Sequence, residues 1–438
     1  MKLLCLSNGH GEDIIAVRIL RELQRLPNPP ELAALPLVGE GEAYAQLEGV
    51  SIIGKVKKMP SGGFIYMDGK QLLRDLKDGL LQLTFSQLKA VRAWAKKGGA
   101  ILAVGDIVPL LFAWMSGAVY AFVGTAKSEY YIRDEAGMLP RRSLWERLEG
   151  WSGSVYLPWE RWLMSRNRCK AVFPRDSLTA QVLQKFSIPV LDLGNPMMDE
   201  LEVEKPEAIF YEPDREWRER QRSMVVTLLP GSRAPEAYRN WQKILQAVAG
   251  LCETFAERKL IFLAALAPSL SLSEFCSGLQ FYGWQQNTNN LLIKETIFFQ
   301  NLPAKLLNES TAKTFILGNS TLILTQHAFA ECLQAGDIAL AMAGTATEQF
   351  IGLGKPALAI PGSGPQFTPA FAEAQSRLLG PSLILVQQPQ QIAAIVQQLL
   401  RDPDLLHLIE ENGQRRMGFP GAARRIAACL MQRLGSGE

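Results

Sequence analysis

The chain has 438 residues, 47% of them hydrophobic and 20% charged, which is the composition of an ordinary globular protein. A chain of this length exceeds one hydrophobic core, so we expect two domains of roughly 200 residues each. Its 46 basic and 43 acidic residues leave a net charge of +3, without the basic excess typical of proteins that bind nucleic acid. We therefore expect no nucleic-acid partner.

Six cysteines are scattered along the chain, without a CxxC pair or a nearby group of histidines. Several lie in apolar runs, as Cys5 does in KLLCLS, and this pattern predicts reduced, buried thiols rather than a zinc site. The apolar run that follows Met1-Lys2 is too short for the hydrophobic region of a secretory signal. These features predict a cytoplasmic protein without a metal site.

Short apolar runs alternate with amphipathic helical segments in the first half of the chain. Strands are predicted at 2–7, 100–104, 171–175 and 189–194, and helices after the first strand, at about 80–96 and at 176–186. Strands that alternate with helices predict a parallel sheet with helices on both faces.

An uncharged run of 20 residues, IVPLLFAWMSGAVYAFVGTA, lies between Asp106 and Lys127 and reaches the length of a membrane span. Pro109, the Ser116-Gly117 pair and Gly124 interrupt it. We favour a buried helix followed by a strand, VYAFVG, over a transmembrane segment.

A polar stretch with two prolines, residues 202–222, is the predicted linker between an N-terminal domain (1–201) and a C-terminal domain (223–417). Alternation restarts after it, with a helix at 235–251 and strands at 223–231, 259–266, 338–343, 356–361 and 383–386. The last segment, 418–438, is a basic amphipathic stretch that we interpret as a helix closing the fold.

The first motif, SNGHGED, occupies residues 7–13, between the first strand and the first helix. Gly9 and Gly11 allow a ligand to approach the backbone beside Asn8, and the start of the helix offers free N–H groups. Ile14 stands where the dinucleotide fingerprint GxGxxG needs a glycine. A purely structural turn is an equal alternative, and packing gives no good reason for His10.

Asp106 follows the strand at 100–104, at the edge where open α/β sheets bind their ligands. It is a candidate general base for an acceptor hydroxyl. Capping the next helix explains an aspartate at this position equally well.

The strongest motif is LLPGSRAPE, residues 228–236, where an apolar strand runs into a turn and then a helix. Gly231 permits close approach of the backbone, Ser232 supplies a hydroxyl and Arg233 a guanidinium. An arginine at a helix N-terminus opposes the helix dipole, so an anionic ligand such as a diphosphate is favoured over a structural turn.

Two further motifs follow in the second half. MAGTATE (342–348) places Gly344, Thr345 and Thr347 in a turn at a helix start. Glu348 either complements the helix dipole or accepts both hydroxyls of a ribose. Gln366 lies on the loop after the strand at 356–361, where its amide is a candidate contact to a donor sugar.

LLPGSR with Glu236, and AGTATE, resemble signature segments of the lipid-A-disaccharide synthase family, and residues 172–201 are similar to the segment that closes its first domain. The resemblance implies two Rossmann-like parallel-sheet domains facing a central cleft, the GT-B arrangement. It also implies an inverting, metal-independent transfer from a nucleotide sugar, most simply a UDP-sugar, to a lipid or lipid-like acceptor, without a cofactor.

Carried over by position, the resemblance makes Asp106 the base and puts Gly231, Ser232 and Arg233 beside the diphosphate. It puts Thr345, Thr347 and Glu348 beside diphosphate and ribose, and Phe329, in His327-Ala328-Phe329, beside the uracil. His10 is a second candidate base.

The chain departs from the family pattern at two places on the acceptor side. SNGHGED replaces an AGExSGD-like loop, and residues 129–153 replace an expected aromatic segment, SPxxWAW, so we expect a related enzyme with a different acceptor.

Residues 141–170 mix four tryptophans with arginines, and with residues 107–115 they favour peripheral contact with the cytoplasmic face of a membrane. Tryptophans packed on the first domain are nearly as economical an interpretation. A UDP-sugar 2-epimerase and a non-catalytic nucleotide-sugar or lipid-binding protein remain alternative functions.

Overall fold

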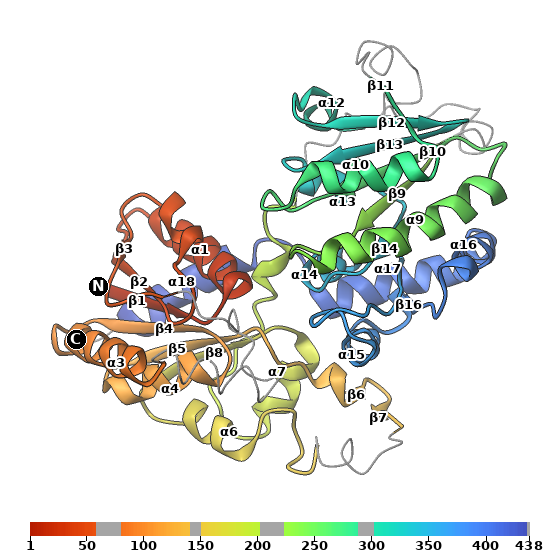
Figure 1. Cartoon of the computed structure of the whole chain (residues 1–438). Helices are drawn as coiled ribbons and strands as arrows, with labels where there is room; N and C mark the ends of the chain where they lie inside the picture. The colour runs from red at the N-terminus through yellow and green to blue at the C-terminus, as the bar shows by residue number, and fades with distance from the viewer. Residues whose placement is uncertain (58–79, 141–149, 202–222, 288–301, 436–438) are drawn as a thin grey trace. The chain divides into compact units, whose positions relative to one another are not determined.

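The computed structural model of the chain describes residues 1–57, 80–140, 150–201, 223–287 and 302–435. It divides into two compact units, one of Met1–Asp199 with Gly418–Glu438 and one of Glu200–Met417 (Figure 1). The predicted linker at 202–222 lies outside the described residues. The segment from Gly418 onward thus returns to the first unit.

The first unit is built on a parallel six-stranded sheet in the order β3-β2-β1-β4-β5-β8. Its strands are β1 (Lys2–Ser7), β2 (Glu31–Pro36), β3 (Ser51–Ile52), β4 (Ala100–Gly105), β5 (Tyr120–Gly124) and β8 (Cys169–Pro174). The predicted strands at 2–7, 100–104 and 171–175 are confirmed, as is the helix at 80–96. Apart from the exposed edge strand β3, these strands are buried along almost their whole length, as expected for a parallel sheet covered on both faces.

Helices cover both faces of this sheet (Figure 1). On one face α1 (His10–Gln24) packs against α18 (Ala422–Gly435). On the other, α3 (Leu80–Lys96), α4 (Ile107–Ser116) and α6 (Pro158–Met164) lie side by side. A further helix, α7 (Ser177–Gln184), follows β8.

The uncharged run at 107–126 consists of α4 and β5, separated by Gly117 in a left-handed conformation (φ +88°). Within the described part of the chain, no helix combines the length and apolar character needed to cross a membrane.

The predicted strand at 189–194 is wrong. Only Val190 pairs with β8, through a single bridge to Val172. The chain then leaves the sheet edge: Asp192 is exposed, and Gly194 adopts φ +85°, far from the extended conformation of a regular strand.

Asp199 explains why the last helix belongs to the first unit. Its carboxylate accepts hydrogen bonds from the backbone N–H groups of Gly421 (2.6 Å), Ala422 (3.1 Å) and Ala423 (2.7 Å). These are the unsatisfied donors at the start of α18, so Asp199 caps a helix more than 200 residues away in sequence.

The second unit has an eight-stranded sheet in the order β11-β12-β13-β10-β9-β14-β15-β16. Its strands are β9 (Met224–Leu229), β10 (Leu260–Ala265), β11 (Gln285–Asn287), β12 (Lys313–Leu317), β13 (Ser320–Thr325), β14 (Ile338–Ala341), β15 (Ala357–Ala359) and β16 (Leu383–Leu385). The six strands from β13 to β16 are parallel, which confirms the predicted alternation, but β11 and β12 are antiparallel. Gly318 and Asn319 form the two-residue turn between β12 and β13, a turn sequence that favours a hairpin.

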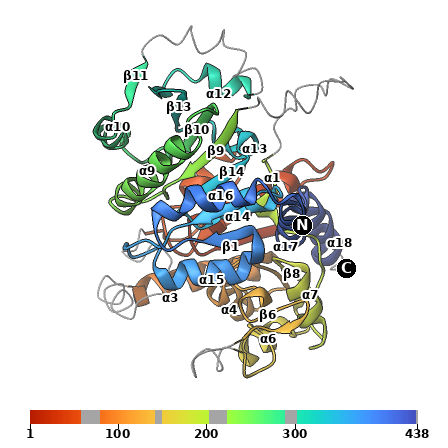
Figure 2. The same cartoon turned by 90° about the vertical axis from the view of Figure 1, so that its right-hand side faces the viewer.

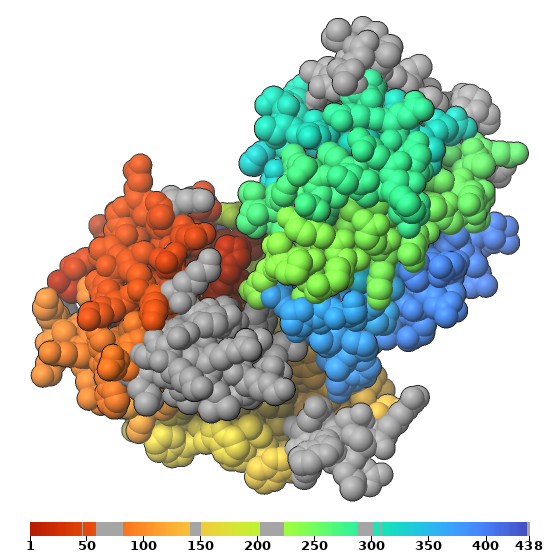
Figure 3. Space-filling view, in the orientation of Figure 1, coloured from red at the N-terminus to blue at the C-terminus, as the bar shows by residue number. Residues whose placement is uncertain are grey.

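Two layers of helices cover this second sheet (Figure 2). One layer contains α9 (Glu236–Thr254), α10 (Leu272–Phe281) and α16 (Ile392–Leu399). The other contains α13 (Phe329–Ala335), α14 (Thr345–Gly352) and α17 (Pro403–Met417), while α15 (Pro369–Leu379) packs beside β16. The side chains of α9 and α10 form a continuous surface on one face of this unit (Figure 3).

Candidate functional site

The carboxyl ends of three adjacent strands in the second unit carry the predicted donor-site motifs. Strands β9, β14 and β15 are neighbours in the sheet, and each runs into a loop at the same edge. Gly231, Gly344 and Gln366 lie on these three loops. Open α/β sheets bind ligands at this edge, where helix N-termini also point.

Gly231 is required by the conformation of the first loop. Its φ is +101°, and a Cβ there would lie 3.3 Å from the backbone oxygen of Met342 at the end of β14. A side chain would therefore be strained and would also push the β9 and β14 loops apart. Ser232 is exposed and Arg233 is half-buried, so both are accessible to a ligand beside this turn.

The loop that carries Gln366 is fastened to the start of α9 by Glu236. This buried carboxylate accepts hydrogen bonds from the backbone N–H groups of Phe367 (2.7 Å) and Gln366 (3.1 Å). A Cβ at Gly364 would lie 2.2 Å from Cδ of Glu236, so only glycine fits there. With its amide oxygen turned toward Arg233, Gln366 accepts from Nε (3.3 Å) and Nη1 of that guanidinium. Gln366, predicted to contact a sugar, thus orients Arg233.

The turn before α14 divides the predicted residues into two groups. Thr345 is exposed at the helix start, and Gly344 accepts a hydrogen bond through its backbone oxygen from Gln375 of α15 (3.1 Å). The Thr347 side chain is fully buried and donates to the backbone oxygen of Ala343 (2.6 Å). In this structure the Thr347 hydroxyl is used within the turn, and its predicted contact with diphosphate or ribose stays a prediction.

Glu348 and Phe329 complete the predicted donor residues. Glu348 is mostly buried in the first turn of α14, where its charge complements the helix dipole. Phe329 is the first residue of α13, after β13, and its ring is 38% exposed. Its place at the same carboxyl edge of the sheet is compatible with stacking on a flat ring.

Replacing Glu236 by glutamine is expected to lower the free energy of unfolding by about 1–3 kcal/mol, because the amide NH₂ would face backbone donors. It is also expected to weaken the binding of a diphosphate ligand, since Gln366 no longer holds Arg233. Chemical denaturation and calorimetry with UDP measure the two effects. Glu253→Gln, at the exposed far end of α9, is the matched control. An unchanged UDP affinity in Glu236→Gln would contradict the role assigned to Glu236.

The first unit gathers polar side chains at the equivalent edge. Asp106 accepts a hydrogen bond from the backbone N–H of Val108 (2.8 Å) and another from Nδ2 of Asn8 (3.0 Å). The two interpretations of Asp106 are thus compatible, because one carboxylate oxygen caps α4 and the other faces Asn8.

The two glycines of the first motif differ. Gly9, with φ +142°, lies immediately before α1 and needs the freedom of glycine. Gly11 lies inside the first turn of α1, has no positive φ, and a Cβ there would contact nothing within 4 Å. The space beside Gly11 is open, and the predicted approach of a ligand to its backbone stays a prediction. His10 is exposed as the first residue of α1.

Sequence reasoning missed Glu12 and Thr125, which join Asn8 and Asp106 at this edge. We name these four residues the strand-end cluster. Burial raises the pKa of Glu12 to about 7, and the neighbouring charge of Asp106 adds to this shift. Burial also raises the pKa of Asp106, against the hydrogen bonds from Val108 and Asn8, which lower it. The only signal in the sequence was the position of Glu12 in the first turn of a helix, which charge complementarity to the dipole already explained.

A second buried carboxyl of α1, Asp13, has a structural role. It accepts from the Ser7 hydroxyl (2.5 Å), which is also within hydrogen-bonding distance of the Tyr44 hydroxyl (2.6 Å). Burial raises the pKa of Asp13 to about 6, with the Ser7 hydrogen bond opposing the shift.

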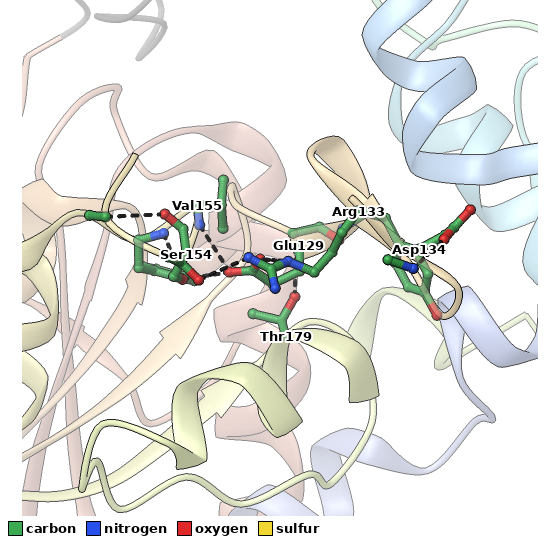
Figure 4. Close-up of polar contacts among 12 residues, drawn as sticks. Glu129, Arg133, Asp134, Ser154, Val155 and Thr179 are labelled. Atoms are coloured by element: carbon green, nitrogen blue, oxygen red, sulfur yellow. Dashed lines mark hydrogen bonds and ion pairs between the residues drawn. The ribbon is translucent and has the colours of Figure 1, made fainter. Parts of the chain in front are cut away.

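The segment at 129–153 that departs from the family pattern is anchored by a buried glutamate. Glu129 accepts from Ser154 Oγ (2.5 Å) and the backbone N–H of Val155 (2.9 Å), and pairs with Nε of Arg133 (2.8 Å) (Figure 4). Its own N–H donates to Thr179 Oγ1 of α7 (2.9 Å). This network holds the hairpin of β6 (Arg133–Asp134) and β7 (Gly137–Met138) to the body of the first unit. Residues 141–149 lie outside the described part of the chain.

Among the residues that the structure describes, no group of three histidine, cysteine, aspartate or glutamate side chains is arranged to hold a metal ion. No disulfide links the six cysteines, which are free thiols.

No family model matches the chain, and no curated protein matches its sequence. Solved structures do resemble it over nearly their full length. CalG4, the calicheamicin glycosyltransferase, has a TM-score of 0.57 at 12% identity and covers 100% of this chain and 99% of its own. MurG from Acinetobacter baumannii has a TM-score of 0.52 at 13% identity and covers 98% and 99%.

A third similar structure is the UDP-GlcNAc 2-epimerase from Neisseria meningitidis bound to UDP-GlcNAc, with a TM-score of 0.51 at 16% identity and coverage of 99% and 100%. At these identities the similarity shows the fold alone. The chain therefore has the GT-B fold, with two Rossmann-like α/β domains, which glycosyltransferases and nucleotide-sugar 2-epimerases share.

Proposed function

We propose that this protein is a glycosyltransferase that moves a sugar from a nucleotide-sugar donor, most simply UDP-linked, to a lipid or lipid-like acceptor. The observation that carries the proposal is the turn at Gly231–Arg233, held against the β14 loop at the carboxyl edge of the second sheet. A half-buried arginine, an exposed serine hydroxyl and the starts of α9 and α14 suit the two charged phosphates of a nucleoside diphosphate. The sequence resemblance to lipid-A-disaccharide synthase, and the UDP-GlcNAc bound by the Neisseria 2-epimerase, support the same ligand class.

In the proposed reaction Asp106 removes the proton from the acceptor hydroxyl while its oxygen forms a bond to the anomeric carbon. The bond from that carbon to the diphosphate oxygen breaks, and its electron pair leaves with the diphosphate. Inversion follows from attack opposite the leaving group. Arg233 and the helix starts stabilise the departing charge. Asp106 suits the role of base better than His10, because two hydrogen bonds fix its carboxylate whereas His10 is exposed.

The direct test is ligand-induced thermal stabilisation with UDP-, GDP- and ADP-sugars, followed by transfer assays on a panel of lipid acceptors. A ligand that binds only the native state raises the melting temperature by mass action. We expect stabilisation by one nucleotide class, and nucleoside diphosphate release that depends on the acceptor. If none of the three nucleotide classes stabilises the protein, the proposed donor site is contradicted. Binding without release across the whole panel would favour a non-catalytic binding protein.

A 2-epimerase is the second candidate, and a specific observation favours it. Glu12 and Asp106 lie together in the first unit with Asp13 close by, and His10 lies on the same helix as Glu12. Several carboxyls and a histidine are what proton abstraction from a sugar carbon requires. Incubation with UDP-GlcNAc and no acceptor separates the two functions, because only the epimerase produces an epimer.

We also propose that the acceptor is reached at a membrane surface through an aromatic, basic patch formed by α3, α4, α6 and Arg166. Trp159 and Trp162, one helical turn apart, are 53% and 44% exposed. Trp162 packs edge-on against Trp114 of α4, with ring centroids 5.3 Å apart, and the Arg166 guanidinium lies 4.3 Å from the centre of its ring.

The exposed charges on this helical layer are positive. Within α3, α4 and α6 the single carboxylate is Glu160, which is buried and paired with Lys127, whereas Lys89 and Arg92 are exposed on α3. Exposed tryptophans beside cations favour the interface of an anionic bilayer.

The double variant Trp159→Ala/Trp162→Ala is expected to reduce sedimentation with phosphatidylglycerol vesicles by about tenfold or more, since each indole leaves the interface. Phe281→Ala, an exposed aromatic of the second unit, is the control and should bind vesicles like the unmodified protein. Equal binding of the double variant and the control would show that this patch does not dock on lipid.

A further inference from the structure

The strand-end cluster brings together residues from three neighbouring strands of the first sheet. Strands β1, β4 and β5 end at one edge and are followed by Asn8, Asp106 and Thr125, and the first turn of α1 adds Glu12. Gly105, with φ +130°, leaves room for this approach. A Cβ at Gly105 would lie 3.2 Å from Cγ of Glu12, so the Glu12 side chain packs on the backbone immediately before Asp106.

The two carboxyls of the cluster have unequal surroundings. Asp106 accepts two directed hydrogen bonds, one on each oxygen, from Val108 and Asn8. Lys127 also favours its charge, although Glu160 opposes it. For Glu12, burial outweighs the contact with its own backbone N–H. The charges of Asp106 and Asp13 also oppose its ionisation. The negative charge is therefore more stable on Asp106 than on Glu12.

The Asn8 amide supplies a second and independent observation. Its side chain is 3% exposed, and its Nδ2 donates to Asp106. Its Oδ1 is buried and accepts no hydrogen bond in the described structure. A buried polar atom without a partner is costly, and in the described structure the Thr125 hydroxyl of the same cluster also has none, so the cluster has polar groups for a ligand to satisfy. A hydroxyl group is the donor that this neighbourhood suits.

We propose that Glu12 and Asp106 form a coupled carboxyl pair that holds one proton, with the proton on Glu12, the charge on Asp106, and the Asn8 amide oxygen open to a substrate hydroxyl. Glu12 is a positioning residue in this arrangement, because it acts through Asp106. When Glu12 loses its proton, its charge makes Asp106 a stronger base. The pair therefore raises the basicity of Asp106 as the pH passes through neutrality.

The pair itself is tested without a substrate, by NMR titration of ¹³C-labelled carboxyl groups. Because Asp106 ionises first, Asp106→Asn removes a neighbouring charge and is expected to lower the pKa of Glu12 by about one unit or more. Glu12→Gln is expected to leave the pKa of Asp106 unchanged, because Glu12 is still neutral at the pH at which Asp106 ionises. Glu22→Gln on the same helix is the control and should move neither step.

Three outcomes would contradict the coupled pair. The pKa of Glu12 could be unchanged in Asp106→Asn, the pKa of Asp106 could be lower in Glu12→Gln, or both groups could have ordinary carboxyl pKa values. The wild type and Asp106→Asn suffice for the test if Glu12→Gln does not fold, and circular dichroism checks each variant.

The catalytic consequence rests on the proposed function and has a separate readout. In the wild type kcat/KM is expected to rise through about pH 7, where Glu12 ionises, and Glu12→Gln should lose this rise while keeping its activity at lower pH. Asn8→Ala should raise KM for the acceptor more than it lowers kcat. If the two carboxyls titrate as a coupled pair but no transferase activity is found, the pair is supported and the proposed function is contradicted. Transferase activity with an unchanged pH profile in Glu12→Gln would show that the pair does not control the basicity of Asp106.

Discussion

Asp106→Asn is expected to reduce turnover by about 10²- to 10⁴-fold, the usual contribution of a general base, while the affinity for the donor stays unchanged. Asparagine caps a helix as well as aspartate does, so α4 keeps its start, while the variant removes the charge and turns an amide NH₂ group toward Asn8. The measurement is the initial rate of nucleoside diphosphate release with an identified donor and acceptor. Calorimetry of donor binding and a melting curve accompany it.

His10 provides the alternative outcome for this experiment. If Asp106→Asn keeps near-normal turnover and His10→Gln loses it, the base is the exposed histidine at the start of α1. The strand-end cluster would then lose its catalytic role although its geometry remains. Glu22→Gln, on the same helix, controls for nonspecific effects on the first unit.

Arg233→Ala is expected to lower kcat by about 10²- to 10³-fold and to weaken UDP binding, because it removes the cation beside the departing diphosphate. Arg233→Lys restores the charge without the planar fork and should recover only part of the loss. The deciding comparison is between UDP and uridine. If Arg233 binds the diphosphate, the variant loses affinity for UDP and keeps its affinity for uridine.

An equal loss of affinity for UDP and uridine would contradict this role. In that case Arg233 would support the loop rather than the ligand, as its contact with Gln366 would allow. Glu236→Gln then distinguishes the two explanations, since it loosens the loop without touching the guanidinium.

The strands of both sheets could be predicted where a continuous apolar run stands beside a helical pattern. Residues 2–7 and 100–104 are such runs, and the structure places β1 and β4 there. The strand predicted at 189–194 failed although its composition is similar, because a strand also needs a partner along its length, and only Val190 has one. The antiparallel β11 and β12 were not predicted, since pairing direction depends on which edge of the sheet the chain reaches.

The candidate site likewise contains residues that local sequence predicts and residues that it does not. Asp106 and Arg233 were found because each follows a strand immediately, and the carboxyl end of a strand fixes the edge on which a residue lies. Glu12 was missed because its importance depends on the adjacency of β1 and β4, about 90 residues apart in the chain. Glu236 and the loop at 364–367 are separated by about 130 residues, and no local pattern marks their contact.

By itself, then, the sequence determined the alternation of strands and helices, the three strand-to-helix turns that contain glycine, and the residue types suited to a diphosphate. These properties depend on local preferences and on periodicity, which neighbouring residues carry. Only the tertiary structure decided that α18 returns to the first unit through Asp199, that Thr347 is used inside its own turn, and that Glu12 lies beside Asp106. Each of these depends on burial and on contacts between distant segments, which are fixed only when the sheets assemble.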